Sequence, residues 1–297
     1  MKIFFAVLLC LVAPSAFAQT KCDGDVVAPQ LSAETRRDFE AKLAEARTQF
    51  EKERSADRLI WVGRRTAYLG NYKDAIALFT DGIRQFPNDA RFYRHRGHRF
   101  LTLRCFDAAI ADFEKAATLI KGKPDEIEPD GLPNARNIPT STLQSNIWYH
   151  LGLGYYLKGD FPRALAAYRE AEKVSTNPDV LVATTHWLYM TLRRLNREKE
   201  AAAVLARIKD NLDVIENADY HKLIDVYKGK LKPEDLLTQD ANTLSNATIG
   251  YGVGNWFLYN GQRAHAEKLF REVTAGNQWS SFGYIAAEAE LKRLGSN

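Results

Sequence analysis

Apolar residues recur at spacings of three and four along most of the chain, which predicts a series of amphipathic helices. Gly70 and Gly159 fall where such helices are expected to end, and glycine favours the left-handed backbone just beyond a helix terminus. The helical pattern stops between residues 122 and 144, where prolines are dense enough to forbid a helix and favour an extended path. The pattern therefore predicts short consecutive helices, interrupted by one long loop.

The helical segments repeat with an offset of 34 residues. When residues 56–89 are laid over residues 90–123, Gly63 falls on Gly97 and Phe79 falls on Phe113. A further copy begins at Ser145, and weaker copies occupy residues 182–215, 216–246 and 247–280. Self-similarity at one fixed period is typical of repeat proteins, in which each unit packs on its neighbours.

The copy that begins at Ser145 shows the pattern most clearly. Its residues follow, in order, the spacing W-x2-L-G-x2-Y…A-x3-F, with Trp148, Leu151, Gly152, Tyr155, Ala164 and Tyr168. On these residues the chain resembles the tetratricopeptide-repeat family. The resemblance implies an all-α fold, a right-handed α-solenoid of helix-turn-helix repeats with a capping helix at each end, and it implies that the first helix of each repeat lines a concave groove.

The repeats divide the chain into consecutive segments. Terminal repeats need a polar outer face, so charged helices are expected at both ends. The expected segments are a signal peptide at 1–18, a leader at 19–31, an N-terminal capping helix at 32–55, repeats 1 and 2 at 56–121, a proline-rich acidic insert at 122–144, repeats 3 and 4 at 145–215, a degenerate repeat at 216–246, and the last repeat with a C-terminal capping helix at 247–297. A loop as long as the insert within a compact array is either disordered or functional.

The first residues have the form of a cleavable secretory signal. Lys2 precedes a short apolar run, and Ala16 and Ala18 form a small-x-small cleavage site. We therefore expect a periplasmic or secreted protein, and no later stretch is apolar enough for stable membrane insertion. In an oxidising compartment Cys22 and Cys105 form a possible disulfide, but two free thiols are equally compatible with the sequence.

Composition and motifs argue against several functional classes. The chain has 41 basic and 37 acidic residues, a net charge of +4, which is too balanced for a typical nucleic-acid binder. It has no phosphate-binding glycine motif, no G-x-S-x-G, no HExxH and no CxxC. We therefore expect a protein that is not an enzyme and has no cofactor or metal.

The stretch "YRHRGHRF" at residues 93–100 lies on a first helix and so contributes to the groove that the resemblance implies. The groove positions are rich in basic and aromatic residues. They include Trp61, Arg64, Tyr68, Arg91, Arg94, His95, His98, Asn146, Tyr149, His150 and His186.

Three interpretations of this surface compete. It could be a solvated polar face, since charge on a helix is often only that. It could bind anions, because the planar fork of arginine suits a carboxylate. It could be a histidine metal site at His95, His98, His150 and His186, although the flanking arginines would repel a cation. We favour a non-catalytic scaffold whose groove binds an unidentified protein or peptide partner with an acidic or C-terminal carboxylate segment. The alternative is a receptor for a small anionic ligand, with residues 122–144 as its lid.

Two arginines depart from the repeat pattern. Arg96 stands where the family places a buried leucine, and Arg99 follows one turn later. A buried guanidinium without a partner is costly. Our hypothesis is that an acidic residue of the insert pairs with Arg96 or Arg99 and pins the insert to the solenoid; the candidates are Asp125, Glu126, Glu128 and Asp130. Otherwise, Arg96 would extend along the surface to reach water.

Overall fold

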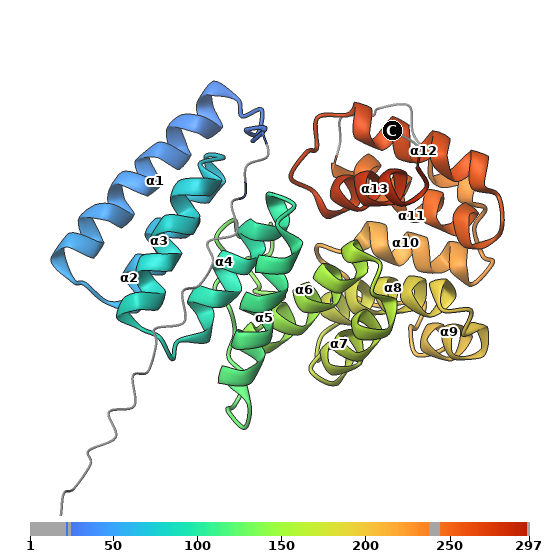
Figure 1. Ribbon diagram of the computed structural model, residues 1–297, viewed down its shortest axis with the longest axis horizontal. Helices are drawn as coiled ribbons and strands as arrows, with labels where there is room; N and C mark the ends of the chain where they lie inside the picture. Colours follow the sequence, from blue (N-terminus) through green and yellow to red (C-terminus); the bar gives the residue numbers. More distant parts are fainter. Residues whose placement is uncertain (1–21, 23–24, 238–243, 296–297) are drawn as a thin grey trace, which may run out of the picture.

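The structure is a computed structural model that describes Cys22 and residues 25–237 and 244–295. The expected signal peptide at 1–18 lies outside the described residues. In the described part, thirteen α-helices and one short 3-10 helix are present and there is no β-strand. The predicted all-α fold is confirmed, and Figure 1 shows the helices following one another around an arc.

The helices pair into hairpins that stack in chain order. They are α1 (Ala33–Lys52), α2 (Ala56–Tyr68), α3 (Tyr72–Gln85), α4 (Ala90–Thr102), α5 (Phe106–Ile120), α6 (Leu143–Lys158), α7 (Phe161–Lys173), α8 (Pro178–Arg194), α9 (Glu198–Leu205), α10 (Ala218–Tyr227), the 3-10 helix η1 (Pro233–Leu236), α11 (Leu244–Tyr259), α12 (Arg263–Ala275) and α13 (Phe282–Arg293). One continuous apolar core runs from α4 to α13, and separate clusters lie under α1, α2 and α3.

Glycine allows the two helices of a hairpin to approach each other closely. A Cβ at Gly63 would lie 2.4 Å from the ring of Phe79, and a Cβ at Gly152 would lie 2.7 Å from the ring of Tyr168. Both aromatic residues occupy the same position in the second helix of their repeat. The repeat pattern therefore pairs a missing side chain with a large ring, and the ring fills the space that the glycine leaves.

The fourth hairpin is followed by an irregular segment. Helix α9 ends at Leu205, and residues 206–217 have no regular helix. The buried carboxylate of Asp179, at the start of α8, orders the end of this segment by accepting hydrogen bonds from the backbone N–H groups of Ile215, Glu216 and Asn217. This brings Glu216 and the start of α10 to the inner side of the arc, where they help to form the site described below.

The C-terminal helix folds back onto earlier repeats. The guanidinium of Arg104, which ends the first helix of repeat 2, lies 3.9 Å from the ring centroid of Trp279 and pairs with Glu288 at 2.7 Å. Farther along α13, Arg293 donates a hydrogen bond to the backbone carbonyl of Leu157 in α6. The two ends of the helical arc are thus joined, and the inner side is not the open groove expected from the sequence.

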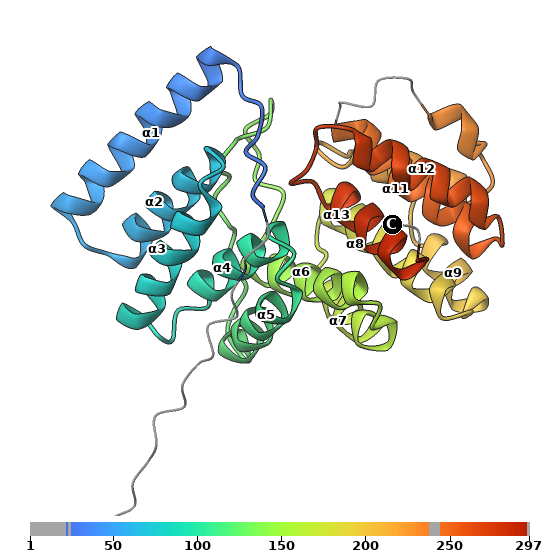
Figure 2. The ribbon, with the colours of Figure 1, turned by 45° about the horizontal axis from the view of Figure 1, so that its top comes forward.

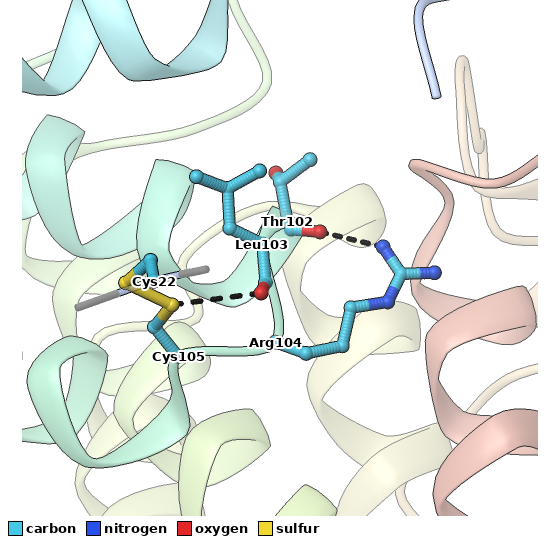
Figure 3. Close-up of a disulfide and its surroundings, with 5 residues drawn as sticks. All are labelled: Cys22, Thr102, Leu103, Arg104 and Cys105. Carbon is cyan, nitrogen blue, oxygen red and sulfur yellow. Dashed lines mark hydrogen bonds between the residues drawn. A yellow bond between two sulfur atoms is a disulfide. The ribbon is translucent and has the colours of Figure 1, made fainter. Parts of the chain in front are cut away.

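A disulfide attaches the leader to the repeats. Cys22 and Cys105 are bonded, with their Cα atoms 5.9 Å apart and 83 residues between them along the chain (Figure 3). Because Cys105 directly precedes α5, the bond anchors the leader at the turn of repeat 2. Among the described residues, no helix is both long and apolar enough to cross a membrane.

Candidate functional site

The insert between α5 and α6 is an ordered loop that turns back on itself. The backbone N–H of Glu128 donates to the carbonyl of Ser141, and the N–H of Leu143 donates to the carbonyl of Glu126. A single antiparallel bridge joins Ile127 to Thr142. In Figure 2 the light-green insert runs between the N-terminal helices and the C-terminal helices.

Side chains hold the insert on both sides. On the N-terminal side, Arg65 of α2 donates to the carbonyl of Gly131 at 2.8 Å. On the other side, Arg136 of the insert pairs with Asp213 at 2.7 Å, and the hydroxyl of Thr140 donates to Glu216 at 2.8 Å. The insert therefore links repeats 1 and 2 to the segment before α10, across the inner side of the arc.

The insert also supplies a carboxylate to the helix that carries "YRHRGHRF". Glu128 Oε2 lies 2.9 Å from Arg94 Nε, and both side chains are about nine-tenths buried. Arg94 Nη1 lies 3.1 Å from His95 Nδ1 and 3.4 Å from His98 Nδ1. Burial and the neighbouring arginines lower the pKa of both histidines well below the usual range, so these rings are neutral and add no positive charge.

The hypothesis for Arg96 was wrong in its partner. Arg96 forms a two-pronged ion pair with Asp112 of α5, at 2.8 Å and 2.7 Å, and its Nη1 donates to the hydroxyl of Thr80. Arg99 has no ion pair in the described part of the chain, and its guanidinium lies 5.7 Å from the ring centroid of Tyr72. Burial lowers the pKa of Arg99 to about 10. The insert is indeed pinned by an acidic residue, but through Glu128 and Arg94.

Three arginines converge on a cavity of about 110 Å³, which we call the arginine cavity. Arg64, Arg94 and Arg99 line it together with Tyr68, His95, His98 and Glu128. Arg64 stacks on Trp61, with 4.4 Å between its guanidinium carbon and the ring centroid, and it has no ion pair among the described residues. Three guanidinium groups thus face one carboxylate, which leaves an excess of positive charge that would attract an anion.

A larger outer cavity of about 400 Å³ adjoins the arginine cavity. The two share Arg64, His95 and Glu128, and the outer cavity adds Trp61 and Arg91. Arg91 is already neutralised, because it pairs with both Asp57 and Asp89. Seven of the predicted groove residues therefore gather around these two adjoining cavities: Trp61, Arg64, Tyr68, Arg91, Arg94, His95 and His98.

The remaining predicted residues lie elsewhere. Asn146, Tyr149 and His150 line a separate cavity of about 470 Å³, which we call the central cavity, and His98 lies between it and the arginine cavity. His186 lies in the packed interior, where its ring stacks on Tyr220 with the centroids 4.5 Å apart. No group of three or more His, Cys, Asp or Glu within the described ranges is placed to hold a metal ion.

Sequence reasoning missed two contributors to the arginine cavity. Arg99 was considered only as a partner for the insert, although it lies one turn after His95 on the same helix and shares its face. Glu128 was one of four acidic candidates in the insert, and nothing in their spacing distinguished it from the others. Only the three-dimensional path of the insert places Glu128, alone of these four, against Arg94.

Comparisons with known proteins agree with this architecture. A family model described as a tetratricopeptide repeat matches residues 63–125, which cover most of repeats 1 and 2. No curated protein matches the chain.

Several solved structures are similar in overall architecture. A tetratricopeptide repeat protein from Parabacteroides merdae has 13% identity and a TM-score of 0.49, over 85% of this chain and 96% of its own. YrrB, described as a TPR protein with an unusual peptide-binding site, has 15% identity and a TM-score of 0.44, over 82% of this chain and 97% of its own. The MamA protein also has 15% identity and a TM-score of 0.44, over 67% and 89%. At these identities they say nothing about the ligand of this chain. The matched repeats and the stacked helical hairpins together make the chain a tetratricopeptide-repeat protein.

Proposed function

We propose that this protein is an exported, non-catalytic scaffold that binds an acidic or C-terminal carboxylate segment of a partner protein. Tetratricopeptide repeats are protein-interaction scaffolds, and the proposal concerns what this one recognises. It is carried by one observation, the convergence of Arg64, Arg94 and Arg99 on a single cavity with only one carboxylate among them. Arginine is the side chain best suited to bind a carboxylate through paired hydrogen bonds.

Glu128 supports the choice of a carboxylate as the ligand group. Its side chain occupies part of the arginine cavity and pairs with Arg94, so the cavity already accepts this chemical group from the chain itself. Arg64 and Arg99 have no such partner among the described residues and keep their charge available for an external anion. Neutral His95 and His98 contribute polar contacts without repelling or attracting the ligand strongly.

The sizes of the two cavities favour the end of a peptide over its middle. The arginine cavity, at about 110 Å³, has room for a carboxylate and little more. The outer cavity, at about 400 Å³, adds apolar surface from Ile60 and Trp61, where the preceding side chains of a peptide could pack. A terminal carboxylate would then reach Arg64 from the outer cavity.

A second candidate is a small anionic ligand held beneath the insert. The contacts of the insert on both sides of the arc favour it, because Arg65 and Arg136 hold the segment across the inner face like a cover. Export to an oxidising compartment forms part of both proposals, and the bond between Cys22 and Cys105 supports it, since disulfides persist mainly in such compartments.

The test is calorimetric titration with an acidic hexapeptide in two forms, one with a free C-terminal carboxylate and one amidated. We expect the free form to bind at least about tenfold more tightly. The double variant R64Q/R99Q should lose this preference, whereas R84Q, which changes an exposed arginine on α3, should keep it. Equal binding of both peptide forms would refute the proposal. Tight binding of a small dicarboxylate, with no binding of either peptide, would support the second candidate instead.

A further inference from the structure

The central cavity differs from the arginine cavity in its charge. It lies where the insert, α6, the start of α10 and the N-terminus of α13 meet, and it measures about 470 Å³. Its charged lining residues are Asp130, Glu216 and Asp219, and the described lining contains no lysine or arginine. The size falls within the range of small-molecule sites, and the lining attracts positive charge.

The three carboxylates are only partly neutralised by their neighbours. Glu216 accepts hydrogen bonds from Asn134 and Thr140, both of which are uncharged donors. Asp219 pairs at 3.2 Å with Lys222, an exposed residue. Asp130 Oδ2 is buried and has no hydrogen-bond partner. The negative charge of the lining is therefore largely available to a ligand.

His150 gives a second and independent indication of a ligand. Its side chain lines the cavity and only 4% of the residue is exposed. Its Nδ1 lies 2.5 Å from the backbone carbonyl of Asn146; because a carbonyl can only accept, Nδ1 carries the proton. The other ring nitrogen, Nε2, is then an acceptor, and it makes no hydrogen bond within the described residues. Burial lowers the pKa of His150 to about 3, so the ring stays neutral near pH 7.

Aromatic rings complete the lining. Tyr149, Tyr220 and Phe282 all border the cavity, and the ring of His150 lies 4.7 Å from that of His98 and 5.4 Å from that of Phe282. Ring faces attract cations, and they do so more strongly where water is excluded. The cavity thus combines acidic groups, a free acceptor nitrogen and ring faces, all of which suit a ligand that is positively charged and carries N–H donors.

We propose that the central cavity binds a small aliphatic amine in its protonated form, with the ammonium group donating to Asp130 and to Nε2 of His150. Glu216 and Asp219 supply the surrounding negative charge, and Tyr149 and Tyr220 pack against the carbon chain. This site uses residues other than the three arginines, so it does not depend on the carboxylate binding proposed above.

The test is calorimetric titration of the full mature chain with putrescine, a four-carbon diamine, and with butanediol and succinate as neutral and anionic compounds of matched length. We expect saturable binding of putrescine alone, accompanied by a rise in Tm, since a ligand of the native state stabilises it. D130N should weaken this binding at least about tenfold. D107N, which changes an exposed aspartate at the start of α5, should leave it unchanged.

Two further arms keep the result clear. R64Q/R99Q should bind putrescine as the unmodified chain does, so failure of the carboxylate proposal would not affect this one. D219N provides a second lining change in case D130N disturbs the insert, and it should also weaken binding. Equal binding of putrescine and butanediol, or no saturable binding of putrescine at millimolar concentrations, would overturn the proposal.

Discussion

Arg94 of α4 and Glu128 of the insert form a buried ion pair, with 2.9 Å between Arg94 Nε and Glu128 Oε2. This contact joins a helix of the repeat array to a segment that does not belong to the repeat pattern. Asn146 of α6 adds a hydrogen bond to the same carboxylate at 3.1 Å. Glu128 therefore connects repeat 2, the insert and repeat 3 at one point in the interior.

Replacing Glu128 should destabilise the fold, because Arg94 would keep its charge in a buried position. We expect E128Q to lower the free energy of unfolding by about 3–5 kcal/mol, the usual cost of breaking a buried pair. Urea unfolding measures this difference. The matched control is E126Q, an exposed neighbour in the same insert, which should change stability by less than about 0.5 kcal/mol. Added formate should restore part of the loss in E128Q, and equal stability of the two variants would contradict the assigned role.

Arg96 and Asp112 should behave as one unit. Removing only the acid, in D112L, leaves a guanidinium that is largely buried between α4 and α5, and it should cost about 3–5 kcal/mol. The double variant R96L/D112L should recover most of that loss, because leucine is the residue that the repeat family usually has at the position of Arg96. Thermal and urea unfolding of the two single variants and the double variant give the coupling energy. Additive effects would show that the pair is not coupled.

The disulfide should stabilise the protein by anchoring the leader. Reduction, or the C22S/C105S variant, should lower the free energy of unfolding by about 2–4 kcal/mol, since the bond closes a long loop in the unfolded chain. Urea unfolding with and without a reductant measures the effect. The serine variant serves as the control, because a reductant should not change its stability. Limited proteolysis should also cut the leader of the reduced protein first, and an unchanged cleavage pattern would argue against the anchoring role.

Stability should fall as the solution becomes mildly acidic. Burial lowers the pKa of His95 and His98, and it lowers the pKa of His150 and His186 to about 3. Below the unfolded value of about 6.5, the unfolded chain takes up protons that the native chain does not bind. Stability is therefore complete above about pH 6.5 and is lost toward the folded pKa values, by up to about 1.4 kcal/mol per pH unit for each histidine.

Urea unfolding between about pH 7.5 and pH 5 tests this dependence while most carboxylates remain ionised. H186F should reduce the slope, since it removes one histidine from the packed interior beside Tyr220. H265F should leave the slope as it is, because the histidine it removes has no share in the predicted dependence. A free energy of unfolding that does not change over this range would contradict the buried, neutral state of these rings.

The hairpins could be predicted from the sequence because their determinants are local. Gly63 and Phe79 lie within one repeat, and their spacing recurs, so the close approach of the two helices is written into the pattern. Gly70 and Gly159 adopt φ values of +84° and +81° at the predicted helix ends. At the equivalent place in repeat 2 the chain has Arg104, also with positive φ, and no local rule for turns anticipates arginine there.

The partners of charged residues were harder to predict because they depend on contacts between distant segments. Asp112 pairs with Arg96 across the hairpin of repeat 2, whereas sequence reasoning sought a partner in the insert. His186 occupies an expected groove position, but α10 packs against it through Tyr220 and Tyr227 and excludes it from the cavities. The degenerate repeat had too little pattern for this packing to be foreseen.

The contact of Arg104 with Trp279 and Glu288 has a mechanical consequence. Open helical arrays stretch like soft springs and fray from their ends, because each unit is held only by its neighbours. Here the last helix grips the second repeat, so pulling on one end would have to break a clasp before any coil could lengthen. Such a molecule should resist extension as a single stiff body and give way in one step.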